Sequence, residues 1–161
     1  MLFRSPLPAK LPLLLGVLAA SMFPPISLAG YLYKLAAALG WLNTLPALIL
    51  PYTAWILPLT LWILVSTFAH IPRELDEAAL LDGANRWQIL TRVVLPVAAP
   101  GMFATGLLAF ILAFNEFLFA LLLTTDHHAR TVPVGVALFQ GLHGELPWGT
   151  VMAAAMLTVV P

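Results

Sequence analysis

The 161-residue chain contains no cysteine, so disulfide bonds, thiolate zinc sites and cysteine nucleophiles are excluded. Charged residues are also scarce, at 9% of the chain, where a soluble domain carries about 25%. Seven basic residues balance seven acidic ones, and no net charge favours nucleic acid as a partner. No phosphate-binding loop of the type G-x-x-x-x-G-K-[ST] occurs, because both lysines, Lys10 and Lys34, precede a leucine.

Hydrophobic residues, in contrast, make up 61% of the chain, and the mean hydropathy is +0.98. Both values indicate that lipid is the solvent of much of this protein. The 14 prolines fit that reading, because neighbouring helices in a membrane can satisfy the carbonyl groups that a proline frees. We therefore expect an all-α fold, a polytopic bundle of transmembrane helices.

Four apolar stretches are predicted membrane spans, at about 11–30, 45–69, 95–123 and 148–161. A spanning helix needs roughly 20 apolar residues. The last stretch is incomplete, because its final run of twelve apolar residues, 150–161, covers only about 18 Å of a hydrocarbon core of about 30 Å. We expect one partial transmembrane domain over residues 1–161, and we interpret the sequence as a fragment of a longer chain.

The distribution of basic residues predicts the orientation of the spans. The amino-terminal tail and the polar loop at 71–94 fall on one side of the membrane, and that side carries more lysine and arginine. This side has Arg4, Lys10, Arg73, Arg86 and Arg92, whereas the opposite side has Lys34 and Arg130. The excess places the 71–94 loop in the cytoplasm, in a multi-pass protein of the plasma or inner membrane.

The polar loop reads as two short helices around a glycine. Pro72 suits a first helical position, Gly83 is where a left-handed cap would end the first helix, and Asn85 with Gln88 is close to a capping box. Ala78 and Ala79 make the first helix thin, so another protein can approach its backbone closely. Two readings remain from composition alone: a solvated linker between two spans, or a docking helix for a cytoplasmic partner.

The segment EAALLDGANRWQILTRVVLP, residues 77–96, resembles the EAA signature of binding-protein-dependent ABC importer permeases. The signature is Glu-Ala-Ala, three residues, Gly, nine residues and Ile-x-Leu-Pro. Val93 replaces its isoleucine. The stretches SMFPPISLAGYLYKLAAALGWLNTLPALIL, FILAFNEFLFALLLT and TVPVGVALF resemble the carbohydrate, maltose-type branch. The matching positions are Glu77, Ala78, Ala79, Gly83, Leu95 and Pro96.

The resemblance implies a MetI-like permease fold in which the loop forms a coupling helix on a cytoplasmic ABC ATPase dimer. It further implies a second permease subunit and an extracytoplasmic solute-binding protein that delivers a sugar. Glu77 would meet a basic residue of the ATPase, the two alanines would allow close approach, and Gly83 would permit the turn. The chain itself would be no enzyme and hold no cofactor, because ATP would be used by the partner.

The third predicted span contains one ionisable residue, Glu116, next to Asn115. A charge at that depth costs about 2.5–3.5 kcal/mol on insertion scales, so it should face the bundle interior or a wet cavity. Asn115 and Glu116 with Phe114 and Phe117 offer hydrogen bonds and aromatic faces to a sugar, which makes them a possible substrate path. The alternative, that Asn115 or Glu116 only bonds a neighbouring helix, is equally open.

Other functions are less well supported. His127 and His128 are adjacent, which is not a metal-ligand spacing, and we predict no metal site. An importer of the same architecture for an amino acid, phosphate or polyamine is an alternative that the carbohydrate-like stretches disfavour. An ion-coupled transporter or an intramembrane enzyme would need paired ionisable groups within the spans, and only Glu116 is there.

Overall fold

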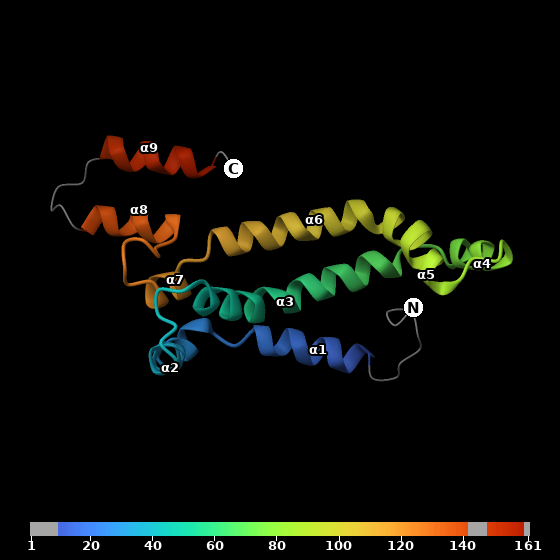
Figure 1. Cartoon of the computed structure of the whole chain (residues 1–161), viewed down its shortest axis with the longest axis horizontal. Coiled ribbons are helices and arrows are strands. Elements are labelled where there is room, and N and C mark those ends of the chain that lie inside the picture. The colour runs from blue at the N-terminus through green and yellow to red at the C-terminus, as the bar shows by residue number, and fades with distance from the viewer. Residues whose placement is uncertain (1–9, 142–147, 160–161) are drawn as a thin grey trace. The chain divides into compact units, whose positions relative to one another are not determined.

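A computed structural model describes residues 10–141 and 148–159 of the chain (Figure 1). The amino-terminal tail with Arg4, and residues 160–161 of the last predicted span, lie outside the described residues. The described part contains helices and no strand, so the predicted all-α fold is confirmed. The elements are α1 (Lys10–Ser21), α2 (Pro25–Ala38), α3 (Leu45–Ala69), α4 (Arg73–Leu81), α5 (Arg86–Ile89), the π-helical turn η1 (Leu90–Val94), α6 (Leu95–Phe114), α7 (Leu118–Leu123), α8 (Val132–Gly141) and α9 (Trp148–Val159).

The chain divides into two compact units, each built from segments that are distant in the sequence. The first unit contains α1, the part of α3 from Trp55 onward, α4, α5, η1, and α6 as far as Leu112. The second contains α2, the part of α3 up to Ala54, and the helices α7, α8 and α9. The two longest helices are thus shared between the units.

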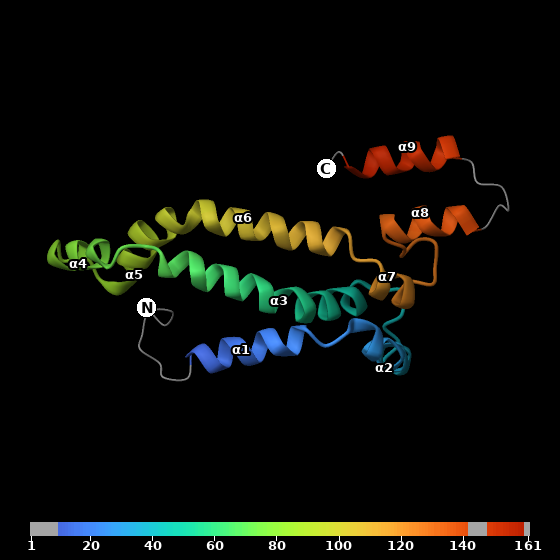
Figure 2. The ribbon, with the colours of Figure 1, turned by 180° about the vertical axis from the view of Figure 1, so that it is seen from behind.

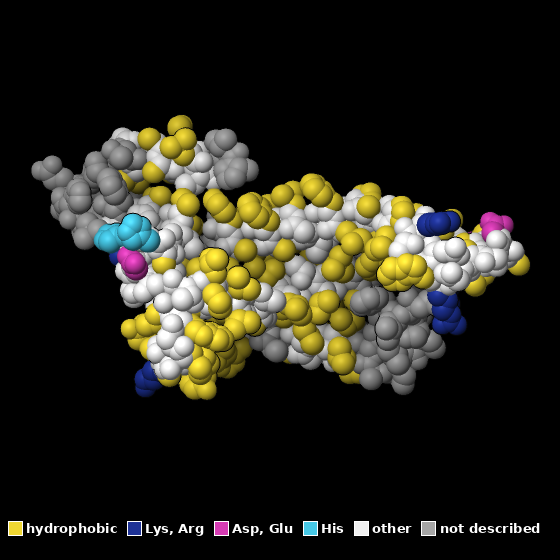
Figure 3. Space-filling model, in the orientation of Figure 1, with side chains coloured by type: hydrophobic (Ala, Val, Ile, Leu, Met, Phe, Trp, Pro, Cys, Tyr) yellow, Lys and Arg dark blue, Asp and Glu magenta, His cyan; other side chains and the backbone are white. Residues whose placement is uncertain are grey.

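Two helices in the described part are long and apolar enough to cross a membrane, Leu45–Ala69 and the continuous helix Arg86–Phe114. In the most apolar stretch of each, only 11% of the residues are buried within the protein. Hydrophobic side chains therefore lie on the surface, as Figure 3 shows along α6. A core helix of a soluble protein would be mostly buried, so lipid-facing helices account for this surface better. Whether the stretches at 11–30 and 148–161 also cross a membrane stays a prediction.

The stretch predicted as one span over 11–30 is not one helix in the structure. α1 ends at Ser21 and α2 begins at Pro25. Pro24 and Pro25 are the physical reason, because a proline disfavours the helical conformation of the residue before it and donates no N–H. Pro24 has an extended ψ of 121° and serves as the N-cap of α2. The predicted span 95–123 is likewise interrupted, between α6 and α7.

The core of the second unit is centred on α7, where Phe119, Ala120 and Leu123 are at most 4% exposed. α2 packs against α7, and α8 packs against α9. Figures 1 and 2, which view the molecule from opposite sides, both show α8 and α9 next to each other.

In the first unit, α3 and α6 cross closely at Thr67 and Gly101. A Cβ atom added to Gly101 would overlap the methyl group of Thr67, so only glycine allows this approach. Ala98 and Thr105, on the same stretch of α6, are buried, and the Thr105 hydroxyl donates to the Gly101 carbonyl at 2.7 Å. The crossing therefore fixes this part of α6 against the second half of α3.

Candidate functional site

The first helix of the polar hairpin, α4, ends as its glycine predicts. Gly83 has a φ of +79°, in the left-handed region that glycine enters without strain. The Ala84 N–H donates to the Ala79 carbonyl at 3.0 Å, and the Gly83 N–H donates to the Leu80 carbonyl at 3.0 Å. These two bonds form a Schellman motif, which satisfies the last carbonyl groups of α4 and turns the chain toward α5.

The second helix begins with the predicted capping box. The Asn85 side chain accepts from the Gln88 N–H at 2.9 Å, and the Gln88 side chain accepts from the Asn85 N–H at 2.8 Å. Both interactions occupy backbone donors that a short helix would otherwise leave unpaired. One detail differs from the prediction: Pro72 is the N-cap of α4 and not its first helical residue, since the helix begins at Arg73.

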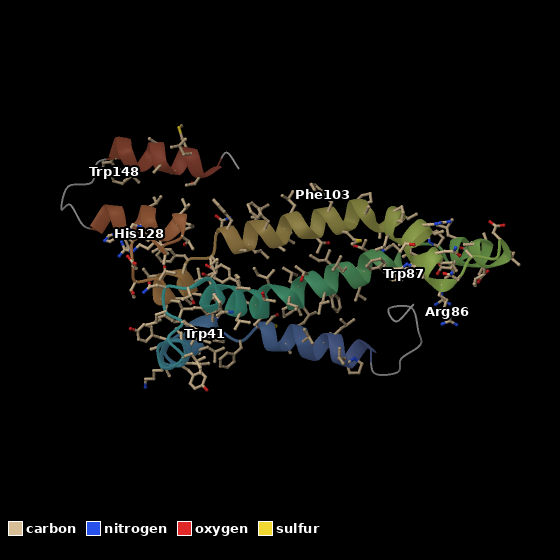
Figure 4. The ribbon with its side chains drawn as sticks, viewed as in Figure 1. Trp41, Arg86, Trp87, Phe103, His128 and Trp148 are labelled. Atoms are coloured by element: carbon tan, nitrogen blue, oxygen red, sulfur yellow. The ribbon has the colours of Figure 1, made fainter. Side chains whose placement is uncertain are left out.

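The hairpin exposes the residues that the EAA signature singles out. Glu77 and Ala78 are exposed on α4, while Ala79 is half-buried. Four large apolar side chains of the hairpin are also exposed, and the most exposed are Leu81 at 90% and Trp87 at 70%. Trp87 and Arg86 are labelled on this hairpin in Figure 4.

Two isoleucines hold the hairpin to its own unit. Ile71, just before α4, is 6% exposed and Ile89, at the end of α5, is 3% exposed. α4 has no buried residue of its own. It packs against α5 and η1. The hairpin is thus anchored at its base, and most of α4 stays available to solvent or a partner.

The last two residues of the signature lie outside the hairpin. Leu95 and Pro96 are the first residues of α6, after the π-helical turn, and Pro96 is exposed. Both residues belong to the continuous helix Arg86–Phe114, which includes α5, and neither lies on α4. The sequence spacing alone gave no sign of the π-helical turn between them.

Glu116 lies at the break between α6 and α7 and is 7% exposed. Its Oε1 accepts from the Phe119 N–H at 2.9 Å and its Oε2 accepts from the Ala120 N–H at 3.1 Å. The carboxylate therefore caps the first turn of α7, where a negative charge also interacts favourably with the helix dipole. The Tyr52 hydroxyl lies near this carboxylate but not in hydrogen-bonding geometry, and the Tyr52 ring is 6.5 Å from that of Phe119.

The other three members of the predicted substrate path are more exposed than Glu116. Asn115 is exposed and Phe117 is 40% exposed, while Phe114 is half-buried. The four residues thus separate into a buried carboxylate that caps α7 and three side chains that are half-buried or exposed. That Asn115 and the two phenylalanines contact a substrate stays a prediction.

Asn43 makes a set of contacts that no local sequence pattern indicated. It is the only non-glycine residue with a positive φ, 62°, in the part of the chain that is described. Its Oδ1 accepts from the Thr125 N–H at 2.7 Å and the Asp126 N–H at 2.8 Å, and its own N–H donates to the Leu123 carbonyl at 3.0 Å. One side chain thus joins the connection before α3 to the end of α7.

The histidine pair is not arranged as a metal site. The His127 Nδ1 lies 2.8 Å from an Nη1 of Arg130, whose Nη2 donates to the Thr125 carbonyl at 3.3 Å. A guanidinium cation next to the ring nitrogen disfavours a second cation there. Within residues 10–141 and 148–159, no cluster of three His, Asp or Glu side chains has metal-binding geometry.

Two long apolar helices joined by a capped, polar hairpin define a helical membrane protein. The chain belongs to the family described as binding-protein-dependent transport system inner membrane component, whose model matches residues 7–160. The resemblance stated from the EAA signature is thereby confirmed.

Three relatives are permease proteins. The chain is 59% identical over 145 residues to the trehalose/maltose transport system permease protein MalG of Thermococcus litoralis, covering 90% of this chain and 52% of that protein. It is 42% identical to the sulfoquinovosyl glycerol transport system permease protein SmoH of Agrobacterium fabrum (90% and 50%). It is 40% identical to the trehalose transport system permease protein SugB of Mycobacterium tuberculosis (98% and 58%). The chain spans about half the length of these curated relatives.

Proposed function

We propose that this chain forms part of the permease subunit of an ATP-driven ABC importer for a sugar. An extracytoplasmic solute-binding protein delivers the sugar, and a second permease subunit completes the path. The three relatives described above are named for trehalose, maltose or sulfoquinovosyl glycerol, which supports a carbohydrate substrate. The chain catalyses no reaction in this account, because ATP hydrolysis takes place on a separate cytoplasmic subunit.

The observation that carries the proposal is the exposed, capped hairpin between two long apolar helices. The Schellman motif satisfies carbonyl groups at the end of α4, and the capping box satisfies N–H groups at the start of α5, so the turn between the two helices has a defined shape. Its exposed alanine-centred helix matches what a cleft in an ATPase subunit can receive. The excess of arginine and lysine on this side supports a cytoplasmic location.

Coupling follows from this arrangement. Closure of the ATPase dimer would displace α4, and the displacement would pass through the hairpin to the long helix Arg86–Phe114. The spans would then alternate between states open to either side of the membrane. Glu77 would meet a basic residue of the partner, and its exposure on α4 supports this role.

The test is a charge reversal with a matched control. Glu77→Lys and Glu74→Lys both reverse an exposed carboxylate on α4, but only Glu77 belongs to the signature. In the assembled transporter in proteoliposomes, we expect Glu77→Lys to lower sugar-stimulated ATP hydrolysis at least tenfold. Glu74→Lys should keep more than half of it. Equal effects of the two substitutions would contradict docking through the signature.

The substrate class is tested on the partner protein. The solute-binding protein that stimulates this transporter should bind a mono- or disaccharide, measured by calorimetry. If that protein binds an amino acid, phosphate or polyamine and no sugar, the proposed substrate is wrong and the proposed importer architecture stands. Uptake that continues without ATP and depends on a proton gradient would overturn the proposal.

A further inference from the structure

The helix between the hairpin and the membrane-spanning segment changes its hydrogen-bond register. The Leu90 N–H donates to the carbonyls of Arg86 and Trp87, four and three residues back, as in ordinary helical turns. The Leu95 N–H donates to the Leu90 carbonyl, five residues back. One extra residue is therefore accommodated in the wide turn η1. Such π-helical turns are rare and often mark functional positions.

Pro96, directly after the wide turn, disfavours a closed α-helical geometry there. A proline donates no N–H, and its ring collides with the carbonyl four residues back, here that of Arg92. Widening the turn moves this carbonyl away. Pro100 lies further along α6 without a wide turn around it, so a proline in this helix does not by itself open one. Pro100 is thus a matched control for Pro96.

The wide turn also lies between an exposed element and a fixed one. On one side, α4 packs against η1, so a push on α4 acts on the turn itself. On the other side, the close crossing of Thr67 and Gly101 holds α6 about two turns after η1. Movement of the hairpin relative to α6 must be taken up between them, and η1 is the stretch there whose hydrogen-bond register already departs from the α-helix.

We propose that η1 is a joint whose hydrogen-bond register changes during the transport cycle, and that Pro96 is the positioning residue that keeps it from closing into a uniform α-helix. When the wide turn moves by one residue, that residue rotates by about 100° and shifts by about 1.5 Å along the axis. A displacement of α4 is thereby converted into a rotation at the entrance of α6. This inference rests on the proposed function.

The test measures a distance within the first unit of the assembled transporter. Because residues 1–161 contain no cysteine, spin labels placed at Glu74→Cys on α4 and Phe103→Cys on α6 compete with no other thiol in this stretch. Both positions are exposed, and Figure 4 labels Phe103 on the outer side of α6. We expect the label distance to shift by about 1.5 Å or more between the nucleotide-free state and the state with ATP bound but not hydrolysed.

Pro96→Ala should abolish this shift and lower sugar-stimulated ATP hydrolysis at least fivefold, while the ATPase subunit still co-purifies. Pro100→Ala should keep the shift and at least half of the stimulation. The inference is overturned if the chain with Pro96 intact shows no shift, or if Pro96→Ala keeps both shift and stimulation. Loss of the ATPase from the Pro96→Ala complex would also overturn it, because Pro96 would then act in assembly and not as a joint.

Failure of this inference is distinguishable from failure of the proposed function. If no ATPase co-purifies with the unmodified chain and sugar stimulates no hydrolysis, the proposed function itself is wrong. If sugar stimulates ATP hydrolysis normally and only the label distance stays constant, the proposed importer function stands and the proposal that η1 is a joint is wrong.

Discussion

The hairpin and the α6–α7 break both contain carboxylates, but those of the hairpin are mostly exposed, whereas the carboxylate at the break is buried. The hairpin pairs backbone polar groups at its turn through a Schellman motif and a capping box, and exposes most of its charged side chains, Glu74 and Glu77 among them. At the break, Glu116 is buried and uses both carboxylate oxygens to cap α7.

The difference separates charge that serves recognition from charge that serves structure. An exposed carboxylate whose neighbours are already satisfied by backbone bonds is free to meet a partner. A buried carboxylate that accepts two N–H groups is committed to the fold, because removing it leaves those donors unpaired.

The largest effect is expected at the turn of the hairpin. Gly83→Pro cannot keep a φ of +79°, since proline fixes φ near −65°, and it also removes the N–H that bonds Leu80. We expect loss of sugar-stimulated ATP hydrolysis by more than tenfold, with membrane insertion retained. Asn tolerates the left-handed region, and the space around Gly83 is open, so Gly83→Asn should keep most activity. A fully active Gly83→Pro transporter would show that the turn does not matter for coupling.

The next effect is expected at the buried carboxylate. Glu116→Leu should destabilise the purified transporter by about 2–3 kcal/mol, because two charge-assisted hydrogen bonds are lost. Glu116→Gln keeps one acceptor oxygen and should lose less, as measured by thermal unfolding. Asn115→Leu, at the exposed neighbour, should lower sugar uptake at equal protein level if Asn115 contacts substrate. A Glu116→Leu protein of normal stability with a raised KM for sugar would reverse the assignment.

The smallest effect is expected at Asn43, whose contacts are exposed. Asn43→Ala loses the bonds to Thr125 and Asp126 and replaces asparagine by a residue that tolerates the left-handed region less well, for about 1–2 kcal/mol. Asn43→Asp keeps the acceptor oxygens and should be nearly neutral, and Asn43→Gly isolates the lost bonds from the backbone strain. If all three variants unfold at the same temperature as the unmodified chain, the contact between the two loops contributes nothing to stability.

The sequence predicted the hairpin well because its signals are local. The glycine cap at Gly83 and the capping box of Asn85 and Gln88 each depend on residues within four positions, and both are present. The two long apolar helices follow from composition over one window. The structural role of Glu116 was open, because a charge in a span predicts that it is satisfied but not by which donors.

The remaining features depend on geometry that no short window contains. The contacts of Asn43 join residues 82 and 83 positions apart. The wide turn η1 depends on how Pro96 is accommodated, and Pro100 in the same helix has no such turn. The break at Pro24 could have been predicted from the sequence, because two successive prolines inside a predicted span disfavour a continuous helix.

The most direct test of the account is a cross-link from the hairpin in intact membranes. Leu81→Cys places a single thiol on the most exposed large apolar residue of the hairpin, in a chain without other cysteines. A thiol-directed photo-cross-linker at this position should capture an ATP-binding subunit, identified by mass spectrometry, and capture should change when ATP is added. Capture of no ATP-binding protein, or labelling of Leu81→Cys by an impermeant reagent from outside the cell, would contradict the proposed coupling of this hairpin to ATP hydrolysis.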